Sequence, residues 1–323
     1  MRFLGKSDAS EKHFISFRHF LLILSAFSSL ILFSCDMGST SITYGNNFKA
    51  SAKLETEYIN GKEGAVVFYD KIPSWLIVPS QIMGYDVIRV KLADVSNIAE
   101  LTYITLPDTV MVVDTFSGAI LLETIKLPKS MVICPMFTGC VMLKSITIPD
   151  SITIIQDLAF TLCTSLESVD FGKGVHTIKN GAFTGCTALK TLTIPDNIKS
   201  IESSAFEDCS GITSLNIGNG LTYINPSAFE DCSGITSLVI GENMANIGET
   251  AFEQSASIRT IMLKAKTPPA VDKSSFKYKE ITSSENSETK DFYYDITLNV
   301  PQASLTAYQN HKIWGKFKTI TGF

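Results

Sequence analysis

The stretch I-P-D-S-I-T-I-I-Q-D-L-A-F-T-L-C-T-S-L-E-S-V, residues 148–169, decides the fold because its apolar residues fall at fixed, uneven intervals. Phe160 lies near its centre, Cys163 follows three residues later, and Leu166 follows six residues later. Aromatic, small and aliphatic residues return at the same offsets 23 residues further along the chain. A period of this length describes a unit of several short elements rather than one helix or strand.

The same offsets recur through the middle of the chain. Six phenylalanines follow one another at intervals of 23 residues, and Phe116 precedes them by 21: Phe137, Phe160, Phe183, Phe206, Phe229 and Phe252. A small residue follows three positions after each of the seven: Ala119, Cys140, Cys163, Cys186, Cys209, Cys232 and Ser255. Such units cannot bury an apolar face alone, so they stack, and the sequence predicts a solenoid.

Each turn of the solenoid should contain a strand. Leu143, Ile146 and Ile148 follow the pattern L-x-x-I-x-I, and the last two alternate with polar neighbours as in a half-buried strand. Each turn therefore adds one short strand to a parallel sheet. A second apolar pair, Ile152 and Ile155 in this turn, precedes the Ala-Phe pair that closes it.

These residues resemble the BspA-like, treponemal-type leucine-rich repeat. Its pattern I-P-x-x-V-x-x-I-x-x-x-A-F-x-x-C-x-x-L-x-x-I is matched by residues 148–169, with β-branched exchanges at Ile152 and Val169. The resemblance covers about residues 101–263. It implies a repeat solenoid, a leucine-rich repeat with a parallel β-sheet on the concave face and short irregular or helical convex segments. The turns ending at Phe116 and Phe137 are two residues shorter than this pattern, which leaves the curvature there open.

We divide the chain into a lipoprotein signal peptide (1–34), a tether (35–57), an N-terminal capping region (58–100), the repeat array (101–264) and a C-terminal capping region (265–323). Caps are expected because the last turn of a solenoid otherwise presents a bare edge. In the C-terminal cap we expect a polar loop over residues 273–291, a strand over 296–300 and a short helix over 304–311. The indole of Trp314 should cover the end of the core.

The N-terminus reads as an export signal. Four basic residues precede an uncharged stretch, Phe20–Ser34, that is shorter than the roughly 18 to 20 residues of a membrane-spanning helix. Its end, Leu32-Phe33-Ser34-Cys35, resembles the bacterial lipobox, which implies cleavage before Cys35 and lipidation of that residue. A plain secretory peptide and a short anchored helix are the alternatives.

The other cysteines and the acidic pairs admit chemical and purely structural interpretations. Five cysteines share one repeat position, where equivalent Cβ atoms point the same way, so we expect free, buried thiols rather than disulfides. The position of Cys134 outside this column has no explanation in the sequence. The pairs Glu207-Asp208 and Glu230-Asp231 suggest either a calcium site or separate solvated carboxylates, and we favour the latter. We therefore expect no metal site.

The composition and the motif content argue against catalysis and nucleic-acid binding. The formal net charge is −5, whereas nucleic-acid binding needs a basic stripe. Only His176 and His311 follow the predicted signal peptide, and the chain contains no G-x-S-x-G, H-E-x-x-H, phosphate-loop or dinucleotide-binding motif. We expect no enzyme and no cofactor.

The outward strand positions form the candidate partner-binding surface, because they alternate with the buried residues. They are small and mostly uncharged: Ser145, Thr147, Ser168, Asp170, Thr191, Thr193, Ser214, Asn216, Ser237 and Val239. Repeat proteins use such faces for docking, so a protein or glycan partner is one interpretation. The other is that exposed strands simply favour threonine and tolerate serine, with function on the convex loops.

The resemblance implies a bacterial surface protein, because BspA-like relatives are associated with adhesion to host matrix proteins and with co-aggregation among bacteria. We therefore expect a protein of the bacterial cell envelope, lipid-anchored at the outer membrane or cell surface, that mediates adhesion. A scaffold lipoprotein inside the envelope and a diversified surface antigen, each without a host ligand, are the alternatives.

Overall fold

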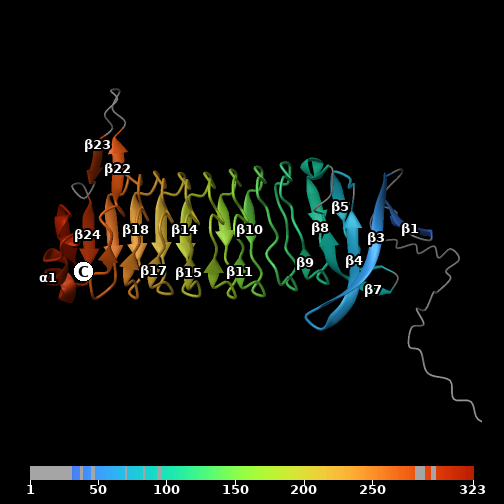
Figure 1. Ribbon diagram of the computed structural model, residues 1–323, viewed down its shortest axis with the longest axis horizontal. Helices are drawn as coiled ribbons and strands as arrows, with labels where there is room; N and C mark the ends of the chain where they lie inside the picture. Colours follow the sequence, from blue (N-terminus) through green and yellow to red (C-terminus); the bar gives the residue numbers. More distant parts are fainter. Residues whose placement is uncertain are drawn as a thin grey trace, which may run out of the picture.

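The computed structural model describes residues 31–36, 39–44, 48–69, 71–82, 84–92, 97–280, 288–291 and 296–323. Most of the predicted signal peptide, residues 1–30, lies outside this range. The array is a parallel β-solenoid whose turns stack side by side along one axis, with a capping region at each end (Figure 1). The predicted fold class, a leucine-rich repeat solenoid with a parallel sheet, is confirmed.

The strands of the L-x-x-I-x-I segments, together with strands of the two capping regions, form one face, which we call the repeat sheet. Its strands are β5 (Trp75–Ile77), β8 (Tyr103–Thr105), β10 (Ser145–Thr147), β12 (Ser168–Asp170), β14 (Thr191–Ile194), β16 (Ser214–Ile217), β18 (Ser237–Ile240), β20 (Thr260–Leu263), β24 (Thr297–Val300) and β25 (Thr319–Gly322). From β14 to β20 the pairing is parallel and in register, so that Leu192, Leu215, Leu238 and Ile261 form one buried column. The predicted strands are therefore confirmed.

A second sheet, made mostly of two-residue strands, forms the opposite face. Its strands are β11 (Ile154–Ile155), β13 (Thr177–Ile178), β15 (Ser200–Ile201), β17 (Tyr223–Ile224), β19 (Asn246–Ile247) and β21 (Ala270–Val271). The resemblance allowed irregular or helical segments here, but residues 101–280 contain no helix. Cys134 now has an explanation: it lies 21 residues after Val113 and 21 before Ile155, and all three fill the same buried position.

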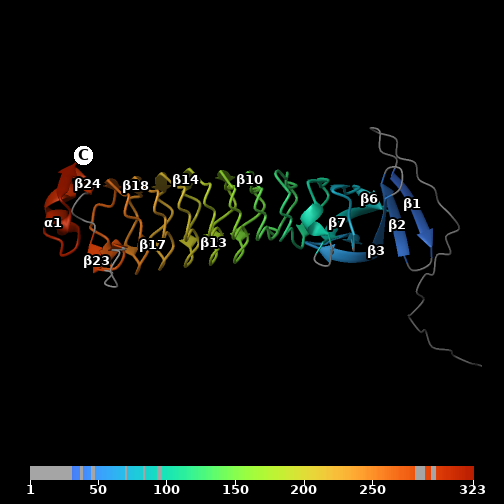
Figure 2. The same cartoon turned by 90° about the horizontal axis from the view of Figure 1, so that it is seen from above.

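The phenylalanines form a continuous stack along the solenoid. Seven successive ring pairs from Phe116 to Phe276 lie 5.0–5.5 Å apart and within 17° of parallel. This spacing is close to the roughly 4.8 Å between neighbouring strands. Because the spacing between turns is similar in the phenylalanine stack and in the sheets, the array bends little. It runs almost straight in two perpendicular views (Figures 1 and 2). The repeat sheet is thus a nearly flat face.

The small-residue column lies beside this stack. The thiols of Cys140, Cys163, Cys186, Cys209 and Cys232 each donate a hydrogen bond to the carbonyl oxygen of a phenylalanine in the previous turn, at 3.1–3.2 Å. Ser255 continues the series at 3.2 Å. All five cysteines are free and buried, as predicted. Burial raises the pKa of the Cys140, Cys163 and Cys209 thiols to about 12.

The N-terminal cap is a mostly antiparallel sheet. Its strands are β1 (Ile31–Asp36), β2 (Ser39–Tyr44), β3 (Phe48–Ile59), β4 (Lys62–Tyr69), β6 (Gln81–Ile82) and β7 (Tyr85–Lys91), and β9 (Val112–Val113) pairs with β7; the 3₁₀ turn η1 (Ile98–Glu100) follows β7. The β3–β4 hairpin turns at Asn60-Gly61, both with positive φ, as tight hairpin turns require. Residues 35–57, expected as a tether, carry the end of β1, all of β2 and most of β3.

The C-terminal cap closes the core with aromatic side chains. It contains β22 (Lys277–Glu280), β23 (Glu288–Asp291), the 3₁₀ turns η3 (Gln302–Ser304) and η4 (Trp314–Lys316), and the helix α1 (Leu305–Gln309). Trp314 is fully buried against the ring of Phe276, and its Nε1 donates to the carbonyl oxygen of Pro269 at 2.8 Å. The predicted strand, helix and indole cover are confirmed. The loop expected over 273–291 was wrong for β22 and β23, which pair antiparallel.

Candidate partner-binding face

The structure places all ten candidate residues on the outer side of the repeat sheet. Parallel, in-register pairing sets Thr191, Ser214 and Ser237 in one column, and Thr193, Asn216 and Val239 in a second column. Ser145 lies beside Ser168, and Thr147 lies beside Asp170, in the same way on β10 and β12. The prediction that these residues share one face follows directly from the strand period.

The exposure of these side chains is uneven. Ser145, Thr147, Ser168, Asp170, Thr191, Thr193 and Asn216 are exposed, whereas Ser214, Ser237 and Val239 are half-buried. Asp170 is the one charged residue among the ten. A flat surface of short hydroxyl side chains lets another molecule approach the strands closely and offers hydrogen-bond donors and acceptors to it.

The face is longer than the sequence analysis proposed. The same outward positions continue through Tyr103, Thr105, Thr260, Met262, Thr297, Asn299, Thr319 and Thr321. Near the C-terminal end, Thr321 Oγ1 donates to Asn299 Oδ1 at 2.7 Å. The signal for β20 was present in the sequence, because Ile258, Ile261 and Leu263 repeat the L-x-x-I-x-I spacing.

Within the described residues 97–280, the repeat sheet is interrupted at two places, because β12 does not pair with β14 and no strand of this sheet lies between β8 and β10. Residues 124–126 occupy the strand position, 21 residues from the equivalent strand on either side, but they form no ladder with β8 or β10. A hollow of about 460 Å³ lies beside them, lined by residues that include Tyr103, Thr105, Thr124 and Lys126. Tyr103 is 52% exposed there, and its hydroxyl accepts a hydrogen bond from Thr105 at 3.2 Å. The face thus has an aromatic and basic notch near its N-terminal end.

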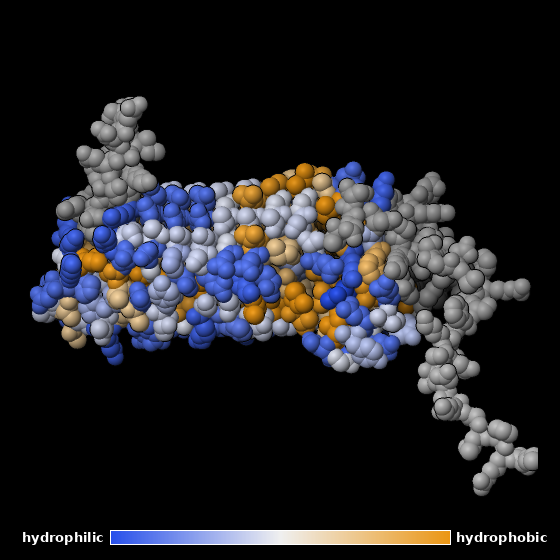
Figure 3. Space-filling view, in the orientation of Figure 1, coloured by the Kyte–Doolittle hydropathy of each residue, from blue (hydrophilic) through white to orange (hydrophobic). Residues whose placement is uncertain are grey.

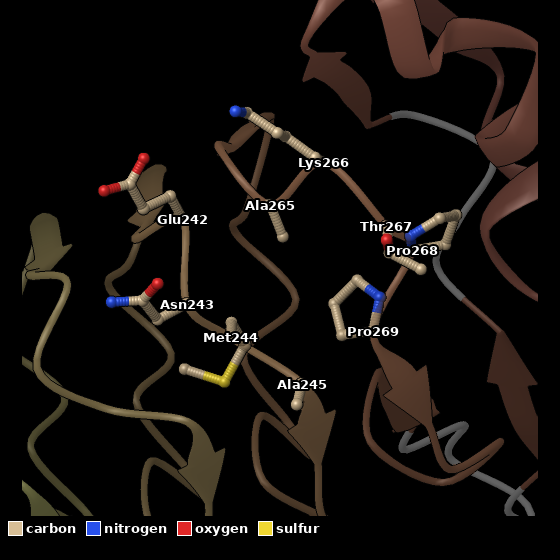
Figure 4. Close-up of a pocket in the computed structure, with 9 residues that line it drawn as sticks. All are labelled: Glu242, Asn243, Met244, Ala245, Ala265, Lys266, Thr267, Pro268 and Pro269. Atoms are coloured by element: carbon tan, nitrogen blue, oxygen red, sulfur yellow. The ribbon is translucent and has the colours of Figure 1, made fainter.

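A second hollow lies between the last array turn and the C-terminal cap (Figure 4). Its volume is about 350 Å³, and its lining includes Glu242, Met244, Lys266 and Pro269. The charged ends of Glu242 and Lys266 lie on its rim, above Met244 and Pro269 (Figure 4). In the part of the chain that the structure describes, no three His, Cys, Asp or Glu residues are grouped to hold a metal ion.

The remaining candidate groups lie away from the repeat-sheet face. His176, between β12 and β13, is exposed and contacts Thr177, whereas His311 Nδ1 accepts backbone hydrogen bonds from Ile313 and Trp314 at 3.2 Å in the C-terminal cap. Cys35 lies in β1, where it pairs with Thr40. The described residues include no helix with the length and apolar run needed to cross a bilayer.

The chain is similar to several solved structures and to one protein-family model. Solved structures similar to this chain include a leucine-rich repeat protein from T. pallidum, with 21% identity over 64% of this chain and 87% of that chain and a TM-score of 0.45. A leucine-rich repeat protein from Bacteroides ovatus has 19% identity over 83% of this chain and 89% of that chain, with a TM-score of 0.47.

A leucine-rich cell surface protein from Faecalibacterium prausnitzii has 16% identity over 90% of this chain and 94% of that chain, with a TM-score of 0.43. No curated protein matches the chain. The model of the BspA-type leucine-rich repeat region matches in six copies over residues 95–212 and 159–282, which together span more than half of the sequence. The chain therefore belongs to the BspA-type leucine-rich repeat family.

Proposed function

We propose that this chain is a lipid-anchored protein of the bacterial envelope that binds a protein or glycan partner through the outer face of the repeat sheet and acts in adhesion rather than catalysis. The observation that carries the proposal is the pair of nearly uncharged columns of small side chains that run in register from β14 to β18. A host matrix protein or a neighbouring bacterial cell is the expected source of the partner.

The physical argument rests on the shape and charge of this face. Residues such as Thr191, Thr193 and Asn216 project only short side chains, so a partner backbone can approach the strands closely. Contacts then spread over several turns, and no single residue dominates them. With Asp170 as the one charged side chain among the ten candidates, affinity should depend weakly on salt, unlike recognition steered by charge.

Membership of the BspA-type family supports a surface role, because the resemblance implies adhesion and co-aggregation. The proposed anchor rests on the resemblance of Leu32-Phe33-Ser34-Cys35 to the lipobox. Two or three acyl chains on Cys35 would attach the protein stably to a membrane, whereas one chain binds only marginally. Wild-type protein expressed in a bacterial host should partition into detergent, and Cys35→Ser should accumulate as uncut precursor. Wild-type protein in the aqueous phase with an N-terminus other than Cys35 would contradict the anchor and leave the binding face untouched.

Binding is tested with the mature chain on a panel of immobilised matrix proteins and intact bacterial cells. Thr193→Trp and Ser214→Arg should block attachment by steric exclusion and leave thermal unfolding nearly unchanged, because outward strand residues contribute little to the core. The control combines Glu207→Gln, Asp208→Asn, Glu230→Gln and Asp231→Asn, which directly follow Phe206 and Phe229 and lie outside the repeat sheet, and it should leave this attachment intact. If the control abolishes attachment and the sheet variants do not, the binding face is misassigned.

A further inference from the structure

The segments that run from two residues before to five residues after each stacked phenylalanine form a long edge of the solenoid, which we call the turn edge. Its first three turns expose six aliphatic side chains, each 36–52% accessible: Ile120, Leu121, Val141, Met142, Leu158 and Leu162. Figure 3 shows this gathering as orange along the upper edge of the molecule, over the green turns of Figure 1. A contiguous apolar patch on a soluble surface marks an interaction site more often than scattered exposed residues do.

Two of these leucines have a backbone conformation that leucine rarely adopts. Leu158 and Leu162 have φ values of 58° and 60°, in the left-handed region. The equivalent positions one turn later are Gly181 and Gly185, which accept positive φ without strain. Later turns place Ser204 and Asp208 at the same two positions, also with positive φ, so the repeat requires this backbone conformation but does not require leucine at either place.

The next turn makes room for both leucines. A Cβ atom added to Gly181 would lie 2.7 Å from Leu158 Cδ2, and one added to Gly185 would lie 3.0 Å from Leu162 Cδ2. Each leucine side chain therefore packs against a glycine of the next turn, and about half of it remains exposed to solvent. The two leucines thus present apolar surface to solvent.

The same edge becomes acidic further along the solenoid. Glu207, Asp208, Glu230 and Asp231 occupy it two and three turns after the leucines, and none of them forms an ion pair with another described residue. Partial burial, followed by repulsion from Asp208, Glu230 and Glu207, raises the pKa of Asp231. Figure 3 shows this part of the upper edge in blue. A basic partner would relieve the repulsion.

The spacing along the edge indicates the shape of that partner. Ring centroids of successive turns lie 5.0–5.5 Å apart, which matches the helical pitch of about 5.4 Å, so one helical turn would meet one solenoid turn. The six spacings from Phe116 to Phe252 cover roughly 30 Å, the length of about 20 helical residues. Beyond them β22 and β23 project past the edge and bound it at its C-terminal end (Figure 1).

We propose that the turn edge docks an amphipathic α-helix of a partner protein. The contact face of this helix is apolar along one half of the helix length and basic along the other half. The apolar half packs on the three turns that expose aliphatic side chains, and the basic half pairs with the two turns that carry Glu207, Asp208, Glu230 and Asp231. This surface is separate from the repeat sheet and does not depend on the function proposed for that face.

The probe is a pair of synthetic 20-residue helical peptides with leucine on half of one face and lysine on the other half, in the two possible orders. Binding to the mature chain is followed by fluorescence anisotropy. We expect one order to bind, with an affinity that falls as salt rises, and a scrambled peptide of the same composition to bind at least roughly tenfold more weakly. A peptide with glutamate in place of lysine should not bind.

Variants of the chain separate docking from folding. The double variant Leu158→Ser/Leu162→Asp copies the residues found at Ser204 and Asp208, which have φ values of 55° and 59°. It should weaken peptide binding roughly tenfold or more, as expected for the loss of two apolar contacts. Its thermal midpoint should stay the same or rise. Leu158→Gly/Leu162→Gly, which copies the following turn, gives an independent repeat of the test.

The charge variant Glu207→Gln/Asp208→Asn/Glu230→Gln/Asp231→Asn should weaken binding and remove most of its salt dependence. The sheet variant Thr193→Trp should bind the peptide as the wild type does. The proposal is overturned if neither peptide order binds better than the scrambled one, or if the folded leucine variants keep wild-type affinity. It is also overturned if Thr193→Trp weakens binding as much as they do.

Discussion

Replacement of Phe183 by alanine tests whether the phenylalanine stack holds the solenoid together. The ring is fully buried in the middle of the array, at 5.0 Å from the Phe160 ring on one side and 5.0 Å from the Phe206 ring on the other. Phe171 contacts it edge-on at 6.0 Å. The substitution therefore removes one ring from the core and three aromatic contacts with it.

We expect this variant to lose about 4 to 5 kcal/mol of unfolding free energy, the upper part of the range for Phe→Ala in a core. The cavity cannot close easily, because backbone hydrogen bonds hold the neighbouring turns in place: Phe160 N–H donates to the Ala182 carbonyl at 2.7 Å, and Phe183 N–H donates to the Ala205 carbonyl at 2.7 Å. Each aromatic pair adds about 0.5 to 1.5 kcal/mol beyond its buried area.

Urea unfolding followed by fluorescence measures the loss. The two tryptophans, Trp75 in β5 and Trp314 in η4, lie at opposite ends of the stack, so each replaced singly by phenylalanine leaves a reporter of one end. Both ends should unfold at a lower urea concentration in Phe183→Ala than in the wild type. A loss below about 2 kcal/mol would refute the reasoning. It would mean that the neighbouring turns collapse into the cavity and that the ring contributes no more to stability than a partly exposed side chain.

Three further predictions concern the buried cysteines and the surface charge of Asp231. Under denaturing, non-reducing conditions the six cysteines after Cys35 should all react with a thiol reagent, and in the native state at neutral pH they should react slowly, because they are free and buried; fewer reactive thiols would mean disulfides. Cys186→Ser should cost about 1 to 2 kcal/mol in urea unfolding, less than Phe183→Ala, because Ser255 makes the same hydrogen bond at 3.2 Å; a loss as large as that of Phe183→Ala would contradict this. Asp231→Asn should raise the unfolding midpoint at pH 7 and leave it unchanged at about pH 2, because a raised pKa in the folded state means that ionised Asp231 destabilises it, and both states are protonated well below the ordinary Asp value of about 3.9; a gain that persists at low pH would exclude this cause.

The sequence predicted the array well because each turn repeats the same local constraints. Phe160, Cys163 and Leu166 have a fixed offset, and stacking in register copies any one turn onto the next. The outward positions follow from the alternation of a strand, so Thr191 and Thr193 were placed on the correct face without any knowledge of their contacts.

Features that break the repeat could not be read in the same way. The 21-residue turns revealed a change of length, but neither the absence of a strand at residues 124–126 nor the hollow beside Tyr103 could be read from it. The strands β22 and β23 pair through their backbones, at residues such as Lys277 and Glu280. They lack an alternating apolar pattern, so this pairing has no signal in the sequence.

The turn edge was missed because a leucine gives no sequence signal of positive φ. The alignment of Leu158 and Leu162 with Gly181 and Gly185 was visible, but its meaning depended on the backbone conformation of those positions. The acidic pairs were considered as a calcium site or a solvated surface, and their continuity with the apolar turns emerged only from the three-dimensional arrangement.

Site-specific photo-crosslinking on living cells tests the central claim, that the outer face of the repeat sheet binds the partner. A photoreactive residue at Thr193 or Thr147, both exposed on this face, should form covalent adducts with a matrix protein or a neighbouring cell during adhesion. The same residue at Tyr223, which is 37% exposed on the second sheet, should not. Adducts from Tyr223 with none from Thr193 or Thr147 would contradict the account.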